Sequence, residues 1–240
     1  MKIALIQIPI IAENIEDNFT KIIEFTKKSK SLGAELIVFP ETTLTDYVRD
    51  IEQFSMEINT EPIIQKIKQL AEKLSVFISF GTLEKEDDKK YITQIFIGPN
   101  NYFYKYRKTW IYSTKDESKI KRHRNEIDYL NPGSGPDLFT IKGIKCSCMI
   151  CADGNSKKCL NSIKKLKPQL VFFPNNREMF RKGYKENIAK EIDSTLLVIN
   201  RISDSWGVNC EGGTAIYSNT GKLISSTKKN SEEILIYDFN

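Results

Sequence analysis

Apolar strands alternate with amphipathic helices along the whole chain, and this alternation predicts an α/β fold in which two layers of sheet are covered by helices. The length of 240 residues fits one large domain, and a hydrophobic content of 40% is enough for a sizeable core. The alternation continues to the C-terminus without an internal repeat, a low-complexity segment or a clear linker. We therefore predict a single domain over residues 1–240.

The first half of the chain is predicted to contain two helices. One spans 14–32, where apolar residues recur at helical spacing before Gly33, a residue that favours the end of a helix. The other spans 61–74 and starts at Glu61-Pro62, because proline is well accommodated in the first turn of a helix. Strands are predicted over 2–9, 35–39, 76–83, 91–98 and 102–106, with turns at Asp87-Asp88 and Asn100-Asn101.

The second half begins with a polar stretch, 109–137, that is predicted to be a long loop with one helical turn. Loops of this length inside a compact domain are usually functional. Helices are predicted over 156–167 and 183–194, and strands over 138–141, 144–150, 169–173, 196–200, 213–217, 222–226 and 233–238. The end of the chain is thus predicted to be rich in strands.

The composition excludes several classes of protein. No apolar run reaches the ~18–20 residues that a membrane span needs, and the apolar N-terminus lacks a small-residue cleavage site, so neither a membrane partner nor a signal peptide is expected. The net charge of +5 falls largely in scattered lysine-rich surface stretches, and residues 119–124 form the one dense basic patch. Because this patch is not a recognisable nucleic-acid module, no nucleic-acid partner is predicted.

The chain has five cysteines, at positions 146, 148, 151, 159 and 210. Their odd number and the absence of a secretory signal indicate a reducing compartment, so a cytoplasmic location is expected. A zinc site among the first four is disfavoured, because Cys146 and Cys148 share a face of a predicted strand and Cys151 points to the other. Tetrahedral zinc sites prefer paired ligands on turns, so no metal is predicted.

Three short segments each place a reactive side chain at or just after the end of an apolar run. They are Phe39-Pro40-Glu41, Tyr106-Arg107-Lys108 and Met149-Ile150-Cys151-Ala152-Asp153. A carboxylate can accept the proton of a thiol, the thiolate can attack a carbon atom, and an ammonium can stabilise the oxygen that becomes negative. The three segments therefore supply the groups that cleavage of an amide-like C–N bond requires.

Cys151 is predicted to lie at a strand–turn–helix junction, which exposes a side chain as a nucleophile elbow does. The backbone N–H of Ala152 is then available to an oxyanion, and the N-terminus of the following helix is expected to lower the pKa of the thiol. The other four cysteines lie in or beside apolar sequence and are predicted to be buried in the core. Because the single histidine, His123, lies in the basic loop, the base for Cys151 is expected to be a carboxylate.

Taken together, these segments resemble the nitrilase superfamily of carbon–nitrogen hydrolases. The order Glu, Lys, Cys and the contexts FPE, YRK and MICAD match the pattern of that family. The opening KIALIQIPI, the GAELIVFPE strand and the later GGTAIYSNTGKLI match its flanks, so the resemblance covers nearly the whole chain. It implies an αββα sandwich that assembles through its helices into a homodimer or a higher homo-oligomer, and a mechanism that uses no metal or organic cofactor.

The resemblance also implies roles for particular residues. Glu41 would be the general base, Lys108 the oxyanion stabiliser and Cys151 the nucleophile. Members of the family often carry a second glutamate before a Pro-Gly in the loop after the lysine. Glu126, six residues before Pro132-Gly133, is the candidate here.

In this family the segment after the next strand often lines the substrate pocket. Asn176 and Arg177 are therefore candidate substrate-binding residues together with Ala152, and their polar and cationic character suits a polar or anionic substrate. The chain departs from many members after the cysteine, where Gly154-Asn155-Ser156-Lys157-Lys158 replaces an aromatic residue and FPE. The branch of the family, and with it the substrate, is left open.

The sequence predicts an amidohydrolase that acts on a small linear amide or an N-carbamoyl compound. A nitrilase is an open alternative, because the same three residues serve both reactions. A glutaminase subunit that supplies ammonia to a separate synthetase is another. A scaffold that has lost catalysis is disfavoured by the intact Glu41, Lys108 and Cys151.

Overall fold

The computed structural model describes residues 1–113, 115, 126–205 and 208–239. The basic patch at 119–124, which includes His123, lies outside the described residues. Within the described part of the chain, no helix combines the length and the apolar character that crossing a bilayer requires. All five cysteines are buried and free of disulfides, as predicted for the four outside the proposed site.

The described strands form two six-stranded sheets and a separate hairpin. The first sheet has the order β14-β1-β2-β3-β4-β5 and contains β1 (Lys2–Gln7), β2 (Leu36–Val38), β3 (Phe77–Glu86), β4 (Lys89–Gly98), β5 (Tyr102–Arg107) and β14 (Glu233–Asp238). The second has the order β13-β12-β9-β8-β7-β6 and contains β6 (Phe139–Ile141), β7 (Ile144–Cys148), β8 (Leu170–Asn175), β9 (Thr195–Asn200), β12 (Ala215–Tyr217) and β13 (Leu223–Ser226).

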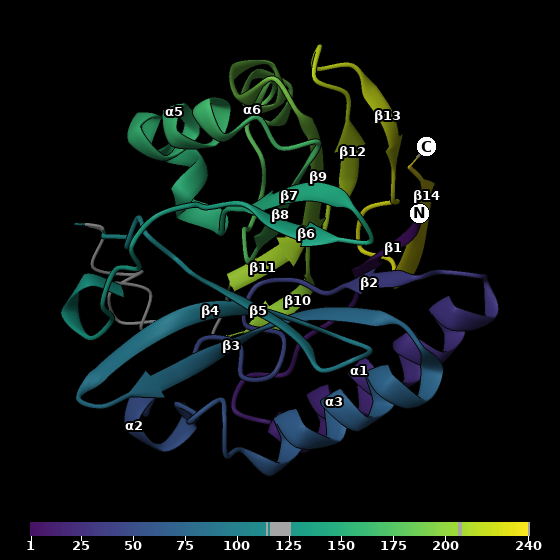
Figure 1. The fold of residues 1–240 in the computed structure, drawn as a ribbon. Coiled ribbons are helices and arrows are strands. Elements are labelled where there is room, and N and C mark those ends of the chain that lie inside the picture. The colour runs from purple at the N-terminus through teal and green to yellow at the C-terminus, as the bar shows by residue number, and fades with distance from the viewer. Residues whose placement is uncertain (114, 116–125, 206–207, 240) are drawn as a thin grey trace.

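Two pairs of helices cover the outer faces of the sheets (Figure 1). Helices α1 (Ile15–Ser31) and α3 (Pro62–Leu74) pack on the first sheet, and α5 (Lys157–Leu166) and α6 (Tyr184–Ile192) pack on the second. A short helix, α2 (Ile51–Phe54), lies outside these layers. Since the inner faces of the two sheets share a third apolar cluster, the layer order is αββα, and the predicted fold class is confirmed.

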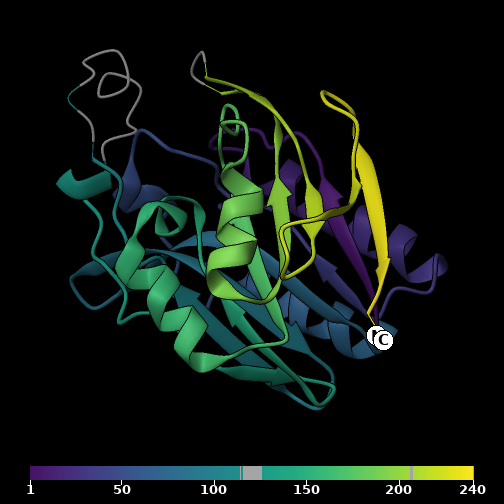
Figure 2. The same cartoon turned by 90° about the horizontal axis from the view of Figure 1, so that it is seen from above.

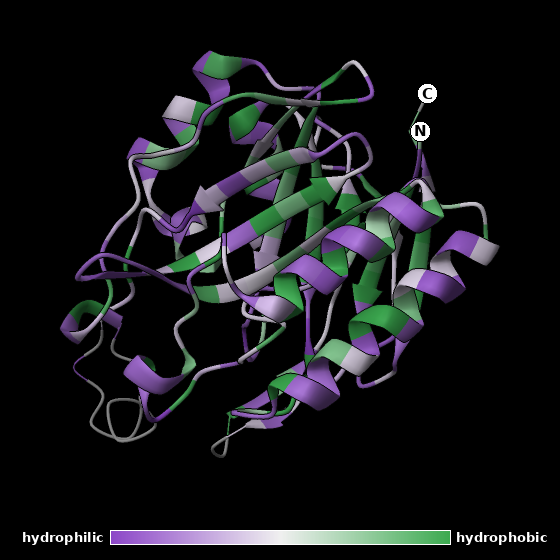
Figure 3. Cartoon of the chain, turned by 60° about the horizontal axis from the view of Figure 1, so that its bottom comes forward, coloured by the Kyte–Doolittle hydropathy of each residue, from purple (hydrophilic) through white to green (hydrophobic). Residues whose placement is uncertain are grey.

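The alternation of side chains along each strand explains why the central strands read as continuous apolar runs. In β8, Leu170 and Phe172 face the core between the sheets, whereas Val171 and Phe173 face α5 and α6. A strand with both faces covered has no solvent side on which to place polar residues. The helices instead have one apolar stripe, and Figure 3 shows hydrophilic and hydrophobic segments alternating along α1 and α3.

The helix boundaries follow the local signals in the sequence. The side chain of Asn14 accepts a hydrogen bond from the backbone N–H of Asp17 and caps α1, and Gly33 follows that helix with a φ of 85°. Pro62 occupies the first turn of α3 as predicted. Asn100 and Asn101 both have positive φ, which is the conformation of a tight hairpin turn between β4 and β5.

Several features depart from the predicted elements. The short helix α2 was not predicted, and β7 ends at Cys148 rather than at residue 150. The first strand ends at Gln7 rather than at residue 9, and Pro9, which has no N–H to donate, makes an isolated bridge to Ile202. The hairpin β10 (Ile202–Ser205) and β11 (Val208–Glu211) was not predicted from the sequence. Each of its strands has only four residues, and apolar and polar residues alternate in β11 alone, where Val208 and Cys210 are buried, so the hydrophobic pattern gives a weak signal there.

The two ends of the described chain lie side by side. Figure 2 shows β14 along β1 at one edge of the first sheet. The two strands pair antiparallel from Lys2 opposite Asp238 to Gln7 opposite Glu233. The C-terminal strand therefore completes the sheet that carries the first strand.

Candidate active site

The three predicted segments meet at the same end of their sheets. Glu41 follows β2, Lys108 follows β5 and Cys151 follows β7. In the first sheet β5 runs in the same direction as β2 and β3, because β4 is antiparallel to both of its neighbours. The side chains of Glu41 and Lys108 are fully buried, and Cys151 is 8% exposed.

Lys108 lies between two carboxylates. Its Nζ donates to Oε1 of Glu41 at 2.9 Å and to Oε1 of Glu126 at 2.7 Å. Glu126 is also fully buried, and its carboxylate accepts hydrogen bonds from the Tyr47 hydroxyl at 2.8 Å and the Tyr112 backbone N–H at 2.9 Å. The thiol of Cys151 lies beside Glu41. The structure thus brings together Glu41, Lys108, Glu126 and Cys151, the four residues that the sequence predicts for the reaction.

The backbone around Glu41 depends on a close approach to β3. A Cβ atom on Gly81 would lie 2.3 Å from the backbone N of Thr42 and 2.9 Å from the carbonyl carbon of Glu41. Only glycine leaves room for the chain to pass there. Thr42 itself has a φ of 48°, so the chain turns sharply directly after the carboxylate.

The backbone that carries Lys108 is fixed in a similar way. Its N–H donates to the carbonyl of Ile92 at 2.9 Å, and its carbonyl accepts from the N–H of Gly133 at 2.8 Å. A Cβ atom on Gly133 would lie 2.3 Å from the Arg107 carbonyl oxygen. The Pro132-Gly133 pair that follows Glu126 in the sequence therefore packs against the end of β5, and this close packing explains why a glycine is needed at position 133.

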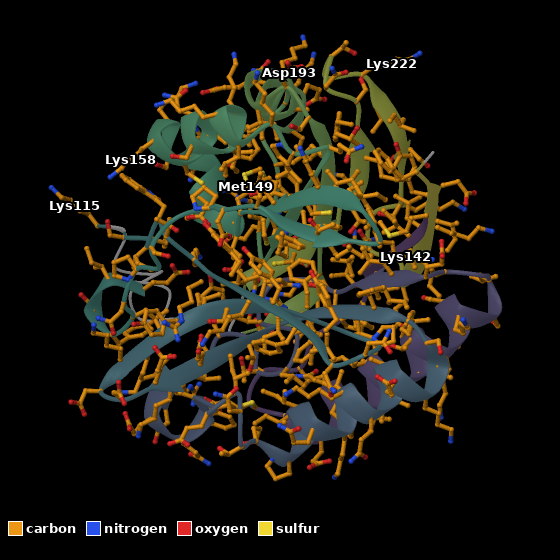
Figure 4. The ribbon with its side chains drawn as sticks, viewed as in Figure 1. Lys115, Lys142, Met149, Lys158, Asp193 and Lys222 are labelled. Atoms are coloured by element: carbon orange, nitrogen blue, oxygen red, sulfur yellow. The ribbon has the colours of Figure 1, made fainter. Side chains whose placement is uncertain are left out.

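Cys151 begins a single 3₁₀ turn, Cys151–Asn155, that separates β7 from α5. Its φ of 41° is in the left-handed region, which is uncommon for a residue other than glycine. Met149, two residues before Cys151, is buried against α5 (Figure 4), whereas the labelled Lys142 and Lys158 lie at the periphery. The thiol is thus carried on a strained turn between β7 and α5, at the junction that the sequence predicts, but its side chain is buried rather than exposed as expected.

Asp153 holds this turn to the segment that follows Lys108. Its Oδ1 accepts from the backbone N–H of Trp110 at 2.6 Å and of Thr109 at 3.1 Å, and its Oδ2 accepts from the hydroxyl of Tyr106 and the N–H of Ile150, both at 2.8 Å. Burial raises the pKa of Asp153 to about 6, although the hydrogen bonds from Ile150, Trp110 and Tyr106 and the charge of Lys108 oppose the shift. The sequence contained this aspartate in the MICAD segment but gave no signal for its contacts.

The charges around Lys108 determine the protonation of the site. Burial alone would lower the pKa of Lys108, but the adjacent charges of Glu126 and Glu41 outweigh it and raise the pKa above its usual value. Burial raises the pKa of Glu41, with a further contribution from the charge of Glu126, and Lys108 opposes this. The second oxygen of Glu41, Oε2, is buried without a normal hydrogen bond, while the thiol of Cys151 lies close enough to lower the Glu41 pKa. Glu41 therefore lies close to the thiol and has one carboxylate oxygen that accepts no hydrogen bond from the described residues.

The expected lowering of the Cys151 pKa by a helix terminus is wrong. Burial, followed by the charge of Glu41, raises the pKa of Cys151 to about 11, against the opposing charges of Arg177 and Lys108. The helix α5 starts only at Lys157, and Ser156 already caps it by accepting from the N–H of Cys159. The helix terminus is thus too far along the chain to act on the thiol, and a neutral thiol beside a carboxylate is the resting arrangement.

The three predicted substrate-binding residues differ in their surroundings. The N–H of Ala152 donates no hydrogen bond among the described residues, so it stays available to an oxyanion. The guanidinium of Arg177 is partly exposed and donates from Nη2 to the backbone carbonyl of Cys151 at 2.8 Å. The amide of Asn176 is fully buried and bonded to Asp46 and Arg201. A direct role in substrate binding stays a prediction for each of them.

Sequence reasoning missed two charged residues behind the site, Asp46 and Arg201. Both side chains are fully buried, and Nη1 of Arg201 lies 3.3 Å from Oδ2 of Asp46. An arginine directly after an apolar strand, as Arg201 follows β9, was the available signal, since such a charge needs a partner when it is buried. Within the described residues, no group of three or more histidine, cysteine, aspartate or glutamate side chains is arranged to hold a metal ion.

A thiol beside a lysine and two carboxylates, on an αββα sandwich, is an arrangement suited to acyl transfer from an amide-like group. The family model described as carbon-nitrogen hydrolase matches residues 2–240, and the chain belongs to that family.

Individual relatives are distant in sequence. A nitrilase of Pyrococcus abyssi is 24% identical over 241 residues, which cover 98% of this chain and 87% of that protein. A glutamine-dependent NAD(+) synthetase of Acinetobacter baylyi is 23% identical over 249 residues, which cover 100% of this chain and 44% of that protein. The chain thus spans less than half of the length of that synthetase.

Solved structures share the fold. An amidase from Nesterenkonia sp. superposes with a TM-score of 0.83 at 18% identity, over 100% of this chain and 90% of that chain. A glutamine-dependent NAD+ synthetase from Acinetobacter baumannii gives a TM-score of 0.83 at 20% identity, over 98% of this chain and 44% of that chain. At these identities the likeness concerns the fold alone.

Proposed function

We propose that the protein is an amidohydrolase that cleaves the C–N bond of a small linear amide or N-carbamoyl compound through a thioester on Cys151. One observation carries the proposal: a buried ammonium, Lys108, is bonded to Glu41 and Glu126, and the carboxylate of Glu41, which has one oxygen without a hydrogen bond, lies close to the Cys151 thiol. A base, a nucleophile and a cation are thus in contact in a site largely closed to water.

In the first half of the reaction, Glu41 accepts the proton of the Cys151 thiol and the thiolate attacks the carbonyl carbon. The oxygen that becomes negative is stabilised by the ammonium of Lys108 and the free N–H of Ala152. When the tetrahedral intermediate collapses, the C–N bond breaks and Glu41 returns the proton to the departing ammonia or amine. The acyl group is left on the sulfur as a thioester.

In the second half, Glu41 takes a proton from a water molecule, which attacks the thioester carbon. The acid is released, and the proton returns to the sulfur. Glu126 keeps Lys108 protonated and oriented, since its own carboxylate is fixed by Tyr47 and Tyr112. This assigns Glu126 to the lysine rather than to the thiol.

Two alternatives use the same residues. A nitrilase would add the thiolate to a nitrile carbon, and the similarity to the Pyrococcus abyssi nitrilase favours testing this reaction. A glutaminase subunit would release ammonia from glutamine for a separate synthetase, and the similarity to glutamine-dependent NAD(+) synthetases favours testing glutamine. The human omega-amidase NIT2 is 25% identical over 176 residues, and this similarity supports an amide as the substrate.

The test is a screen for ammonia released from amides, carbamoyl amines, nitriles and glutamine, with Cys151→Ala as the blank. Turnover of an amide or carbamoyl compound, with a labelled thioester trapped on Cys151, supports the proposal. Ammonia from glutamine alone would favour the glutaminase subunit, and acid from nitriles alone the nitrilase. Absence of turnover on every class would favour a scaffold. Activity is expected to survive exhaustive chelation, because the proposed chemistry uses side chains and no metal.

The assembly and the location are further expectations that follow from the family and the composition. We expect a homodimer or a higher homo-oligomer, in the cytoplasm, with a small-molecule substrate and no nucleic-acid or membrane partner. Light scattering on the purified protein would measure the oligomer size.

A further inference from the structure

Two consecutive residues after β8 reach in different directions. The side chain of Asn176 donates to Oδ1 of Asp46 at 2.6 Å and to the hydroxyl of Thr42 at 3.4 Å. The guanidinium of Arg177 donates to the backbone carbonyl of Cys151 at 2.8 Å. Successive side chains of an extended chain point to opposite sides. One dipeptide therefore contacts both the loop that follows Glu41 and the turn that carries the thiol.

Arg201 holds the side chain of Asn176 in the position from which it bonds to Asp46. The Nε of Arg201 donates to Oδ1 of Asn176 at 2.6 Å, and its Nη1 lies 3.3 Å from Asp46. Its Nη1 also donates to the hydroxyls of Ser203 and Ser205. Because Arg201 and Asp46 are fully buried, each would be an uncompensated charge without the other. The amide of Asn176 is thus bonded on both its donor and its acceptor side, with neither left for a substrate.

The hydrogen bond from Arg177 to the carbonyl of Cys151 is held in place by further contacts of Arg177. The N–H of Arg177 donates to Oδ1 of Asn200 at 3.0 Å, and its carbonyl accepts from Nδ2 of Asn200 at 2.9 Å. Its Nε donates to Asn175 and its Nη2 also donates to the hydroxyl of Tyr184, whose ring lies 4.8 Å below the guanidinium carbon. A side chain held at this many points presents its charge to the Cys151 turn in one orientation.

The backbone of Cys151 needs such support. Its left-handed φ of 41° persists only where the surroundings hold it, since such a conformation costs of order 1–3 kcal/mol for a residue that is not glycine. Asp153 holds the N–H of Ile150 just before it, and Arg177 holds the carbonyl of Cys151 itself. The nucleophile is therefore fixed on both sides along the chain.

We propose that Asn176 and Arg177 form a positioning unit that keeps the loop of Glu41 and the turn of Cys151 in register, and that they act through these two residues rather than by binding the substrate. The proposal rests on the proposed function, in which Glu41 must reach the thiol of Cys151. In this unit Asn176 positions the loop that carries the base, Glu41, and Arg177 positions the turn that carries the nucleophile, Cys151. The charge of Arg177 also favours the Cys151 thiolate, as its effect on the thiol pKa indicates.

The test compares Arg177→Gln and Arg177→Lys with the matched control Arg181→Gln, which removes the same charge from an exposed position in the same segment. The first measurement is the rate at which iodoacetamide alkylates Cys151, followed against pH by mass spectrometry. The reagent is uncharged and needs no substrate pocket. We expect Arg177→Gln to slow the alkylation roughly tenfold and to shift its midpoint to higher pH by about one unit. Arg177→Lys should recover part of the rate, and Arg181→Gln should match the wild type.

The second measurement is turnover of the amide found in the screen. Misplaced reacting groups lower kcat, so we expect kcat of Arg177→Gln and Asn176→Leu to fall by about ten- to a hundredfold with KM changed by less than about threefold. A KM raised tenfold or more, with kcat and the alkylation rate unchanged, would show that these residues bind the substrate and would overturn the proposal.

Two controls separate the possible failures. If iodoacetamide does not label Cys151 of the wild type ahead of the other cysteines, the proposed function fails and this inference fails with it. If Cys151 is labelled but Arg177→Gln behaves like the wild type, only the inference fails. Should Arg177→Gln not fold, Tyr184→Phe decides the question, because it removes one anchor of the guanidinium and leaves the charges in place. A several-fold slower alkylation supports the proposal, and an unchanged rate overturns it.

Discussion

The side chains of Glu41, Lys108 and Glu126 form a buried chain of charges, with Nζ of Lys108 at 2.9 Å and 2.7 Å from the two carboxylates. Removal of one partner from a buried ion pair typically costs about 3–5 kcal/mol, because the other charge is left without compensation. Substitutions at these residues therefore change stability as well as reactivity. Circular dichroism and thermal unfolding should precede every activity measurement on them.

The first prediction at this scale concerns the selectivity of alkylation. Burial raises the pKa of Cys146 to about 12 and the pKa of Cys148 well above its usual value, and neither thiol has the carboxylate partner that Cys151 has in Glu41. Iodoacetamide should therefore label Cys151 first and abolish activity in proportion. Peptide mapping after partial inactivation checks this. Labelling of Cys146 or Cys159 with retained activity would refute the assignment of the nucleophile.

The second prediction concerns the acid limb of the pH profile. Glu41 must be deprotonated to accept the thiol proton, and its pKa is raised above 4.5 by burial. Activity should therefore be present above this raised pKa and should be lost as the pH falls through it. Lys108 keeps its charge over the same range because its pKa is raised. A profile of kcat/KM from about pH 4 to 9 measures the limb. A midpoint at or below 4.5 would contradict the role of Glu41.

The third prediction concerns the joint action of Glu41 and Lys108. Glu41→Gln keeps the shape but removes the base, so thioester formation should nearly stop. Lys108→Ala should lower kcat by about 10²–10³ through loss of oxyanion stabilisation. Because the two groups act as one unit, the double variant should be little worse than the worse single variant. A single-turnover assay of thioester formation tests this, and full activity of a folded variant at either position would exclude the triad.

At the scale of elements, each reactive side chain stands just beyond a strand, and its backbone is fixed by a neighbouring segment. Gly81 lets the chain after Glu41 cross β3, and Gly133 lets the loop of Glu126 pack on the end of β5. In both places the nearest atoms are backbone atoms, which cannot rotate away as a flexible side chain can. The strands therefore direct the side chains to the site, and the close approaches set their final positions.

The prediction at this scale uses Gly133→Ala. Its Cβ would lie 2.3 Å from the carbonyl oxygen of Arg107, so the backbone that carries Lys108 must move, and activity should fall at least tenfold. Gly143→Ala is the control, because Gly143 has a φ of 81° and open space around it. It should cost about 1–2 kcal/mol of stability through its backbone conformation and leave kcat/KM unchanged in the folded protein. Equal activity of the two variants would show that the close approach does not position Lys108.

At the scale of the whole molecule, the two sheets are joined by an aromatic group. The rings of Phe96 and Phe139 lie 4.8 Å apart, and Phe172 from the second sheet lies 5.3 Å from Phe96. Cys151 belongs to the same apolar cluster. The packing of the sheets and the geometry of the site are thus parts of one core.

The prediction at this scale is that Phe172→Ala lowers the free energy of unfolding by about 3–5 kcal/mol, because it leaves a cavity between the sheets. Phe103→Ala is the matched control, since Phe103 is 37% exposed, and it should cost less than about 1 kcal/mol. Urea unfolding of both variants at neutral pH measures the difference. Similar losses in the two variants would contradict a core shared by the sheets.

Much of this protein follows from local patterns in its sequence. One helix ends just before Gly33 and another begins at Pro62, as the sequence predicts, and the apolar runs predict the strands that precede Glu41, Lys108 and Cys151, because such signals act within a few residues of the chain. The hairpin β10–β11 was not predicted, because its strands have four residues each and only β11 alternates apolar and polar residues.

The tertiary structure decided the properties that depend on distant residues. The sequence predicted a lowered pKa for Cys151, and the fold raises it, because burial and the charge of Glu41, 110 positions earlier in the numbering, act on the thiol and α5 does not. The hydrogen bonds of Asn176 to Asp46 and Arg201 likewise join segments far apart in the chain, and its role in substrate binding stays a prediction. Burial and charge contacts are set by packing between segments far apart in the chain, so a local pattern can nominate a reactive residue but cannot fix its environment.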